Sequence, residues 1–440
     1  MLAARKPHIV FILVDDLGWN DVSWHNTGVV MPNLDAMARS GLILEQAYSQ
    51  PTCSPTRAAL LTGYYPSRTG YQFMPPNNME PIGLPTSFNL LPEYIAKLGY
   101  SSHALGKWHL GFCSSEYLPT NRGFESFYGF YNAMGYHKSH ITAGDMKNIW
   151  GSIGYDFHLN EQLSLGAIGR YTDDLIVDRV NDILFKRNGI EKGWFSGYPD
   201  GKIQMENNEE EDPFFLYLAY QSPHMPLQVD PKYLELYPNK TDISRKTYLA
   251  MVSSMDDSIG RIVENMKRFT YTKDGSERTL FDDTIFIFSS DNGGMSEGLG
   301  YGGASNKPLR GRKGDTWEGG CRVPAFITNL NMTGTHEDMF HMTDWLPTIY
   351  SGILGANQAD LGDIDGINQL NVLQKTSEPL RYEILYDIAN FQDTNFTFYV
   401  PPPGTWPASF ELSGSFGAAL RVNNFKLIVG CSTIIGCSSN

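Results

Sequence analysis

The sequence has no excess of basic residues. Its 440 residues include 34 lysines and arginines against 48 aspartates and glutamates, a formal net charge of −14. Nucleic-acid-binding proteins usually carry a basic patch, and no basic run stands out in this chain. The composition therefore argues against nucleic acid as a partner. It also means that an anionic substrate would have to be bound by local cationic groups.

Cysteine is scarce as well. No two of the cysteines form a Cys-x-x-Cys pair, so a zinc site is not expected. If Cys53 is modified, an even number remains, which permits two disulfides whose pairing stays open. Cys431 and Cys437 are close enough in sequence to bridge. The five cysteines are Cys53, Cys113, Cys321, Cys431 and Cys437.

Long hydrophobic runs are missing too. No apolar stretch approaches the roughly 20 residues that cross a membrane, so no membrane span is expected. The apolar run at 9–14 ends in two acids rather than in a small-residue cleavage site. It therefore predicts a core strand, and no signal peptide is visible. Sequons at Asn239, Asn331 and Asn395 nevertheless suit a secreted or lysosomal protein.

Buried strands and helices alternate along the chain. Uninterrupted apolar runs, rich in β-branched residues, are typical of strands buried on both faces. Alternation with helices predicts a three-layer α/β domain with a large, mostly parallel sheet between helices. The strands are expected at 8–14, 100–104, 214–220 and 284–288. The helices are expected at 32–40, 56–61, 90–98, 171–185, 247–268 and 342–354, with a polar surface insertion at 187–212.

The C-terminal part predicts a separate small unit. A polar linker spans roughly 355–378, and strands are expected at 381–387, 418–422 and 426–429. Asn423-Asn424 is the turn of a predicted hairpin. We therefore expect a catalytic α/β domain at 1–355 and a small α+β subdomain with an antiparallel sheet at 378–440.

Acidic and amide side chains follow two of the expected strands. Asp15 and Asp16 come after strand 8–14, and Asp291 and Asn292 come after strand 284–288. Functional groups of open α/β sheets collect beyond the carboxyl ends of strands. Each pair alone could cap a helix or form a turn. Together they offer only hard oxygen ligands, which suit Ca²⁺ or Mg²⁺.

A cysteine precedes a proline and an arginine at the expected start of a helix. Pro55 suits a first helical turn, so Cys53 would lie at a helix N-terminus, where an anion is favoured. Arg57 lies one turn further on the same face. A buried structural cysteine and a surface arginine are the simpler interpretations. The stretch reads Cys53-Ser54-Pro55-Thr56-Arg57, with Leu61-Thr62-Gly63 after it.

This stretch resembles the signature of the sulfatase family, Cys-x-Pro-x-Arg followed by Leu-Thr-Gly, without a departure. The chain most resembles the arylsulfatase B, I and J group of these formylglycine-dependent members of the alkaline phosphatase superfamily. The likeness extends over nearly the whole chain and implies an alkaline-phosphatase-like fold. Family members usually continue further, which leaves the completeness of the small subdomain open. Two further motifs match, at 106–111 (Gly-Lys-Trp-His-Leu-Gly) and at 308–313 with 317–320 (Trp-Glu-Gly-Gly).

The resemblance implies a cofactor and a modification. In the family the signature cysteine is oxidised to formylglycine before folding is complete, so Cys53 would be a substrate of the formylglycine-generating enzyme. One Ca²⁺ per chain would be bound by Asp15, Asp16, Asp291 and Asn292, with an oxygen of the modified Cys53 beside it.

The resemblance also implies roles for five cationic or titratable residues. Arg57 would position the formylglycine and neutralise charge. Lys107 and Lys313 would bind sulfate oxygens. His109 would hydrogen-bond the formylglycine hydroxyl and later act as a base, and His224 would contact sulfate or protonate the leaving oxygen. Taken singly, a histidine is more often structural, and the 308–313 loop could be a solvated basic turn.

The implied activity is that of a sulfuric ester hydrolase. One hydroxyl of the hydrated aldehyde attacks sulfur, which gives a covalent sulfo-enzyme and releases the alcohol. The other hydroxyl then loses its proton to His109, the aldehyde re-forms and sulfate leaves. The implied substrate is an aryl sulfate or a sulfated sugar, such as the N-acetylgalactosamine 4-sulfate of dermatan or chondroitin sulfate, degraded in the lysosome.

Two other functions remain open at this stage. One is a phosphodiesterase or phosphonate hydrolase of the same superfamily. The other is a non-catalytic sulfated-glycan binder whose Cys53 is never oxidised. The regions expected to select a sugar carry no readable motif; they are 72–85, 131–165 and 390–415.

Overall fold

One large sheet organises the computed structural model. The structure describes residues 6–72, 81–142, 154–190, 201–205, 213–273, 275–296, 302–389 and 417–430. The strands of the large sheet are His8–Val14 (β1), Leu42–Leu44 (β2), Ser101–Lys107 (β4), Ser126–Phe130 (β5), His158–Leu159 (β6), Gln162–Leu163 (β7), Phe214–Ala219 (β9), Thr284–Ser290 (β12), Ala325–Thr328 (β13) and Gly334–His336 (β14). Their spatial order is β14-β2-β13-β12-β1-β9-β4-β5-β6-β7.

The centre of this sheet is parallel. Strands β12, β1, β9, β4 and β5 pair in parallel, and Ile9 of β1 lies opposite Ile285 on one side and Phe215 on the other. Antiparallel pairing begins at β13 on one flank and at β6 on the other. Every residue of β1 is buried. The predicted, mostly parallel sheet is therefore confirmed at its centre, while antiparallel pairs occur on both flanks and the outermost pair, β14 with β2, is parallel again.

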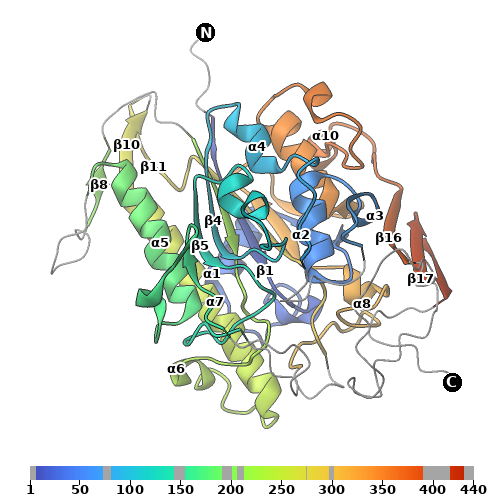
Figure 1. Ribbon diagram of the computed structural model, residues 1–440, viewed down its shortest axis with the longest axis horizontal. Coiled ribbons are helices and arrows are strands. Elements are labelled where there is room, and N and C mark those ends of the chain that lie inside the picture. Colours follow the sequence, from blue (N-terminus) through green and yellow to red (C-terminus); the bar gives the residue numbers. More distant parts are fainter. Residues whose placement is uncertain are drawn as a thin grey trace.

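Helices cover both faces of the sheet (Figure 1), which confirms the three-layer α/β prediction. Side chains of β1 alternate between two hydrophobic cores, because successive residues of a strand point to opposite faces. Residues 9, 11 and 13 contribute to one core and residues 10, 12 and 14 to the other. The first core includes apolar residues of Cys53–Thr62 (α2) and Leu91–Ala96 (α4). The second includes Pro32–Ser40 (α1), Thr172–Arg187 (α5) and Ile243–Arg268 (α7).

Shorter elements complete the described fold. The remaining α-helices are Pro66–Thr69 (α3), Pro231–Leu234 (α6), Glu318–Cys321 (α8), Trp345–Pro347 (α9) and Leu370–Leu373 (α10). Small sheets are formed by Ala47–Tyr48 (β3) with Phe340–His341 (β15), and by Ile203–Gln204 (β8), Phe269–Lys273 (β10) and Ser276–Thr279 (β11). The 3-10 helices are Trp19–Asp21, Ser115–Tyr117, Pro119–Asn121, Leu165–Ala167, Met342–Asp344 and Gln358–Leu361.

Two expectations about the chain after residue 340 were wrong. The single helix expected at 342–354 is a 3-10 turn, then α9, then a π-helix at Thr348–Ile353. Pro347 lacks the N–H that a regular α-helix needs at that position. The segment at 355–378 is more than a polar linker, because Leu361, Val372 and Leu373 are at most 2% exposed.

The C-terminal strands form the predicted antiparallel sheet. Glu383–Ala389 (β16), Gly417–Val422 (β17) and Phe425–Gly430 (β18) pair in this order. In Figure 1, β16 and β17 lie at the right-hand edge, on the side of α3 and α8. Asn423 has φ 50° in the turn between β17 and β18, as expected for a hairpin. The domain boundaries at 355 and 378 stay a prediction. Within the described residues, every helix is too short or too polar to cross a membrane.

Some sequence predictions fall on other parts of the chain. Most of the surface insertion expected at 187–212 lies outside the described residues, although residues 203–204 form β8. Cys431 and Cys437 also lie outside them, so their pairing stays a prediction.

Candidate active site

The acids that follow β1 and β12 meet at one edge of the sheet. Val14 pairs with Ser290 at the carboxyl ends of these parallel strands. The backbone N–H of Asp16 consequently donates to Asp291 Oδ1 over 3.4 Å. Asp15, Asp16, Asp291 and Asn292 are all at most 4% exposed. The two strand ends singled out in the sequence therefore lie side by side, although 275 residues separate Asp16 from Asp291.

Cys53 is the first residue of α2 and points at these acids. Its Sγ lies 3.5 Å from Asp15 Oδ1, and the side chain is 2% exposed. A helix N-terminus lowers the pKa of a thiol. Here burial, followed by the carboxylates of Asp15 and Asp291, raises the pKa of the Cys53 thiol to about 12. Burial and the two acids thus outweigh the helix, and the thiol is neutral.

Three cations pair with the three acids. Arg57 donates to Asp291 Oδ2 from Nε and Nη2, over 3.1 and 2.7 Å. Lys107 Nζ donates to Asp15 Oδ2, and Lys313 Nζ lies 2.6 Å from Asp16 Oδ1. Burial alone would raise the pKa of Asp15, but Lys107 and the other cations lower it well below its usual value. Asp15 is therefore ionised, at the centre of a cluster whose charges nearly balance.

Neither Arg57 nor Lys313 is the surface residue that the simpler interpretation offered. Arg57 is fully buried and Lys313 is 8% exposed. Arg57 also donates from Nη1 to the carbonyl oxygen of Lys107 over 3.1 Å, which joins α2 to the end of β4. The two motifs that contain Arg57 and Lys107 therefore contact each other directly.

The two predicted histidines border the cluster. Both ring nitrogens of His109 are buried and have no hydrogen-bond partner among the described residues. Burial, with Lys107 and Arg57, lowers the His109 pKa well below its usual value. His224 donates from Nδ1 to the Met225 carbonyl oxygen over 2.6 Å, so its Nε2 faces Asp16 Oδ2 at 3.6 Å. Burial and Lys313 lower the His224 pKa to about 3.

Two residues of the site have a strained backbone. Asp16 has φ 65° and His109 has φ 56°, in the left-handed region. For residues other than glycine this conformation costs on the order of 1 kcal/mol or more, and it recurs at functional sites. Neighbouring contacts stabilise both residues. Ser54 Oγ donates to the His109 carbonyl oxygen over 2.7 Å, and Tyr248 Oη donates to that of Asp16 over 2.8 Å.

The donor set fits a hard cation. Asn292 Oδ1 is buried and has no hydrogen-bond partner in the described part of the chain, while its Nδ2 donates to Asp16 Oδ1 over 2.6 Å. Ligand atoms of Asp15, Asp16, Cys53 and His224 lie within 4.8 Å of one another. His224 belongs to this tight group and Asp291 lies outside it; the expected set of metal ligands stays a prediction. The carboxylate oxygens of the aspartates, together with the unpaired amide oxygen of Asn292, are ligands that suit Ca²⁺.

The comparisons with known proteins agree with this arrangement. The family model described as Sulfatase matches residues 7–351. This chain belongs to the sulfatase family. Arylsulfatase J of Mus musculus is 33% identical over 430 residues, 97% of this chain and 64% of the relative. N-acetylgalactosamine-6-sulfatase of Homo sapiens is 31% identical over 336 residues, 73% of this chain and 57% of the relative. The chain thus spans less than two thirds of either relative.

Solved structures show the same fold as this sulfatase-family chain. The crystal structure of Ps i-CgsB has a TM-score of 0.75 and 29% identity, and the match covers 96% of this chain and 84% of that one. The crystal structure of the same protein in complex with k-i-k-neocarrahexaose has a TM-score of 0.74 and 28% identity, and the match covers the same shares of the two chains. The expected alkaline-phosphatase-like fold is confirmed by these neighbours.

Sequence reasoning missed Asn306, which connects the loops of this sulfatase-family site. Its Oδ1 accepts from the N–H of Gly294 over 2.9 Å, and its Nδ2 donates to the carbonyl oxygens of Gly294 and Gly311 over 2.8 and 3.2 Å. Gly294 follows Asn292, and Gly311 precedes Lys313. Asn306 stands before Lys307-Pro308 without any local pattern that marks a structural role, so no signal in the sequence could have found it.

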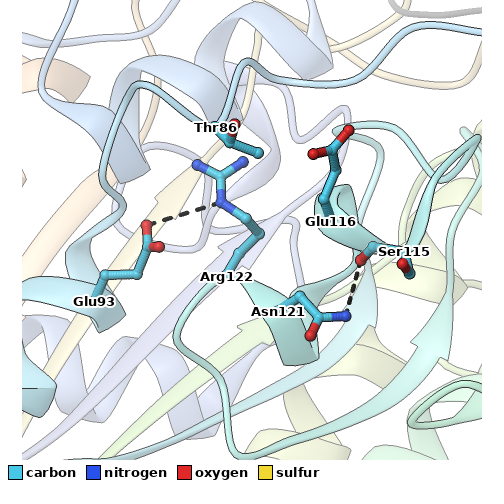
Figure 2. A pocket seen from close by; sticks show the side chains of 6 residues that line it. All are labelled: Thr86, Glu93, Ser115, Glu116, Asn121 and Arg122. Carbon is cyan, nitrogen blue, oxygen red and sulfur yellow. Dashed lines mark hydrogen bonds and ion pairs between the residues drawn. The ribbon is translucent and has the colours of Figure 1, made fainter.

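A polar pocket elsewhere lacks the features of an active site. It has a volume of about 400 Å³, and Figure 2 shows Arg122 beside Glu93 within it. Arg122 Nε lies 3.8 Å from Glu93 Oε2, and the guanidinium donates to the carbonyl oxygens of Leu84 and Phe88. These bonds fix the chain before α4. None of the pocket-lining residues belongs to the cluster around Cys53; they are Thr86, Glu93, Ser115, Glu116, Asn121 and Arg122.

Proposed function

We propose that this protein is a sulfuric ester hydrolase that cleaves a sulfate monoester with a formylglycine made from Cys53. The observation that carries the proposal is the position of Cys53. It begins α2, 3.5 Å from Asp15, beside the lysines that pair with the same acids. Membership of the sulfatase family supports it. When formed, the hydrated aldehyde would supply two hydroxyls on one carbon, one to attack sulfur and one to release sulfate.

Charge explains how such a site binds an anion in an acidic protein. The carboxylates of Asp15, Asp16 and Asp291 are matched by Arg57, Lys107 and Lys313, so the cluster is close to neutral. A bound Ca²⁺, for which Asp15, Asp16, Asp291 and Asn292 are the proposed ligands, would add two positive charges and stabilise negative charge on sulfate oxygens. Local attraction would then outweigh the net charge of −14.

Side chains around Cys53 would bind sulfate, orient residue 53 and transfer protons. Lys107, at the end of β4, and Lys313 bring two ammonium groups to the acids around Cys53, where they would bind sulfate oxygens. Arg57 is fixed between Asp291 and the Lys107 carbonyl, where it orients residue 53. His109 has two buried ring nitrogens without a partner in the described chain and can accept the proton of a hydroxyl on residue 53. His224 presents Nε2 to the site and can protonate the leaving alcohol.

A sulfated carbohydrate is the proposed substrate. Arylsulfatase J and N-acetylgalactosamine-6-sulfatase are relatives, and the neighbouring Ps i-CgsB was crystallised with k-i-k-neocarrahexaose. The first compound to test is N-acetylgalactosamine 4-sulfate from dermatan or chondroitin sulfate. We further propose maturation by the formylglycine-generating enzyme in the secretory pathway, with a lysosomal or secreted product. Asn239 and Asn331 are exposed, as glycosylated sequons must be, and Asn395 lies outside the described residues.

The test combines mass spectrometry of the peptide that contains residue 53 with an assay of sulfate ester hydrolysis. Conversion of cysteine to formylglycine lowers the mass of the peptide that contains residue 53 by about 18 Da. We expect this shift in protein from a secretory pathway, together with hydrolysis of p-nitrophenyl sulfate, and neither in Cys53→Ala. Converted protein that binds sulfated glycan without turnover would favour the binder. Converted protein that prefers an aryl phosphodiester would favour the phosphodiesterase.

A further inference from the structure

We propose that Glu318 is a positioning residue through which the small C-terminal sheet fixes the loop of Lys313 at the active site. Glu318 belongs to the Trp317-Glu318-Gly319-Gly320 motif, and the proposed chemistry gives it no part. The inference rests on the proposed function, because Lys313 is assigned there to sulfate binding.

Glu318 receives two cations from two strands of the C-terminal sheet. Its Oε2 accepts from Arg421 Nη1 of β17 over 3.2 Å, and its Oε1 lies 2.7 Å from Lys426 Nζ of β18. Tyr48 Oη of β3 donates to the same Oε2 over 2.9 Å. Burial would raise the pKa of Glu318, but Lys426 and its other partners lower it, so the carboxylate is ionised. One side chain of the main domain is thus bonded to two adjacent strands.

The two cations are themselves fixed in place. Lys426 also donates to the Thr316 carbonyl oxygen over 2.9 Å and lies 4.0 Å from the centre of the Tyr386 ring. Arg421 donates to Gln46 Oε1 over 2.9 Å. Both cationic side chains are 12% exposed and Glu318 is 28% exposed. Solvent and salt therefore screen these pairs less than surface ion pairs. Loss of the carboxylate would leave two poorly solvated cations without a counter-charge.

Backbone bonds carry this anchoring to Lys313. Gly319, next to Glu318, donates its N–H to the Arg310 carbonyl oxygen over 2.7 Å, which closes the loop that contains Lys313. Gly314 donates to the Pro51 carbonyl oxygen over 2.8 Å, just before Cys53. A displacement of Glu318 would therefore disturb the loop that contains Lys313.

The same loop also contacts the segment that follows Asn292. Gly293 donates its N–H to the Gly320 carbonyl oxygen over 2.9 Å. A Cβ on Gly293 would lie only 1.9 Å from the Gly319 carbonyl oxygen, so the two backbones touch. Lys313 ends in a flexible four-carbon side chain, and a shift of about 1 Å in its support is enough to weaken a positioned contact substantially. The ion pairs of Glu318 limit that shift.

The deciding variant is Glu318→Gln, which can still accept from Tyr48 but forms no ion pair with Arg421 or Lys426. We expect the KM for p-nitrophenyl sulfate and the inhibition constant of inorganic sulfate each to rise about tenfold. Rates are normalised to formylglycine content, so a loss of folded enzyme does not mimic the effect. A purely structural role would lower Tm and yield but leave both constants unchanged.

Arg381→Gln is the matched control. Arg381 forms another buried ion pair near β16, with Asp344 Oδ2 at 2.7 Å, and is 4% exposed. Its other hydrogen bonds within the described chain also avoid the 310–320 loop; they go to Tyr65, Thr343, Asp365 and Glu383. This variant should lower Tm without raising KM or the sulfate inhibition constant. An equal rise in this control would overturn the proposal.

A double variant tests whether the effect runs through the same contact. Arg421→Gln with Lys426→Gln should raise both constants at least as much as Glu318→Gln, because it also removes the bonds to Gln46 and Thr316. Adding Glu318→Gln to it should have little further effect, since both ion pairs of Glu318 are already lost. The proposal would be contradicted if Glu318→Gln left KM and the sulfate inhibition constant unchanged. It would also be contradicted if the effects of Glu318→Gln and of the double variant were fully additive. If the wild type hydrolyses no sulfate ester, the proposed function fails. Calorimetric sulfate binding to the same variants then still tests the positioning role.

Discussion

At the scale of the residue, the charged neighbours of His224 have opposite effects on its pKa. Burial and Lys313 favour the neutral ring, whereas Asp15 favours the charged one, and the net result is a pKa of about 3. An anionic ester placed between Lys313 and His224 would add negative charge and raise this pKa. The ring would then carry the proton that a leaving alcohol needs.

We therefore predict that His224→Asn discriminates between substrates. Its kcat on a sulfated sugar should fall about 10²- to 10⁴-fold, because a sugar alkoxide must be protonated as it leaves. Its kcat on p-nitrophenyl sulfate should change far less, because nitrophenolate is a stable anion. Steady-state kinetics on both substrates, at equal formylglycine content, give the answer. Equal losses on both would show that His224 binds sulfate instead.

The sequence could place the site residues but not their partners. Asp15, Asp16, Asp291 and Asn292 were predicted from strand ends, because neighbouring parallel strands end at the same edge. The bond between Arg57 and Asp291 joins residues 234 positions apart and has no local pattern. The contacts of Asn306 and Glu318 were missed for the same reason, since they depend on how loops pack after the sheet has formed.

At the scale of the element, β4 depends on a glycine directly before Lys107. Gly106 has φ +99°, and a Cβ there would lie 2.0 Å from the carbonyl oxygen of Ala219 in β9. The atom in the way is backbone within a parallel ladder, so it cannot move aside. Close approach of β4 to β9 therefore requires glycine at this position.

We predict that Gly106→Ala destabilises the protein severely and that Gly99→Ala does not. Gly99 also has a positive φ, 83°, but no described atom lies within 4 Å of the position that a Cβ would take there. The control should cost about 1 kcal/mol of unfolding free energy from strain alone. Gly106→Ala should cost more than about 3 kcal/mol. Urea denaturation measures both, and similar values would contradict the steric explanation.

The sequence predicted the positions of helices and strands correctly where a segment had one clear hydrophobic pattern. The buried runs at 8–14 and 284–288 became β1 and β12, and 32–40 became α1 with the expected bounds. Residues 42–48, for which the sequence predicted no element, contain β2 and β3, which belong to different sheets. Hydrophobicity alone cannot show where a chain leaves one sheet for another.

At the scale of the whole molecule, one buried acid links stability to pH. Asp173, in the first turn of α5, is 1% exposed and accepts from Ser222 Oγ over 2.9 Å. Burial raises its pKa to about 7, in spite of that hydrogen bond. An unfolded chain releases this proton near pH 4. Between about pH 4 and about pH 7 Asp173 binds a proton in the folded protein that it has lost in the unfolded chain, so its contribution to stability falls as pH rises through this window.

We predict that Asp173→Asn removes this contribution to the pH dependence of stability, since the amide still accepts from Ser222 but does not ionise. The stability difference across the window is on the order of 4 kcal/mol. The variant should therefore gain stability relative to wild type between about pH 5 and about pH 8, measured by urea unfolding. Asp174→Asn is the control, because that neighbouring carboxylate is 49% exposed and pairs with Arg261. A wild type whose stability rises through the window in parallel with Asp173→Asn would refute the assignment.

The strand order of the large sheet has a consequence for solubility. Its two outermost strands, β14 and β7, contain only three and two residues. An unpaired strand edge is a template on which another polypeptide can add a strand. Edges this short present few free N–H and C=O groups, so strand addition at either end would gain few hydrogen bonds. The long, strongly apolar strands at the centre are thereby kept out of intermolecular β-aggregation while the molecule is folded.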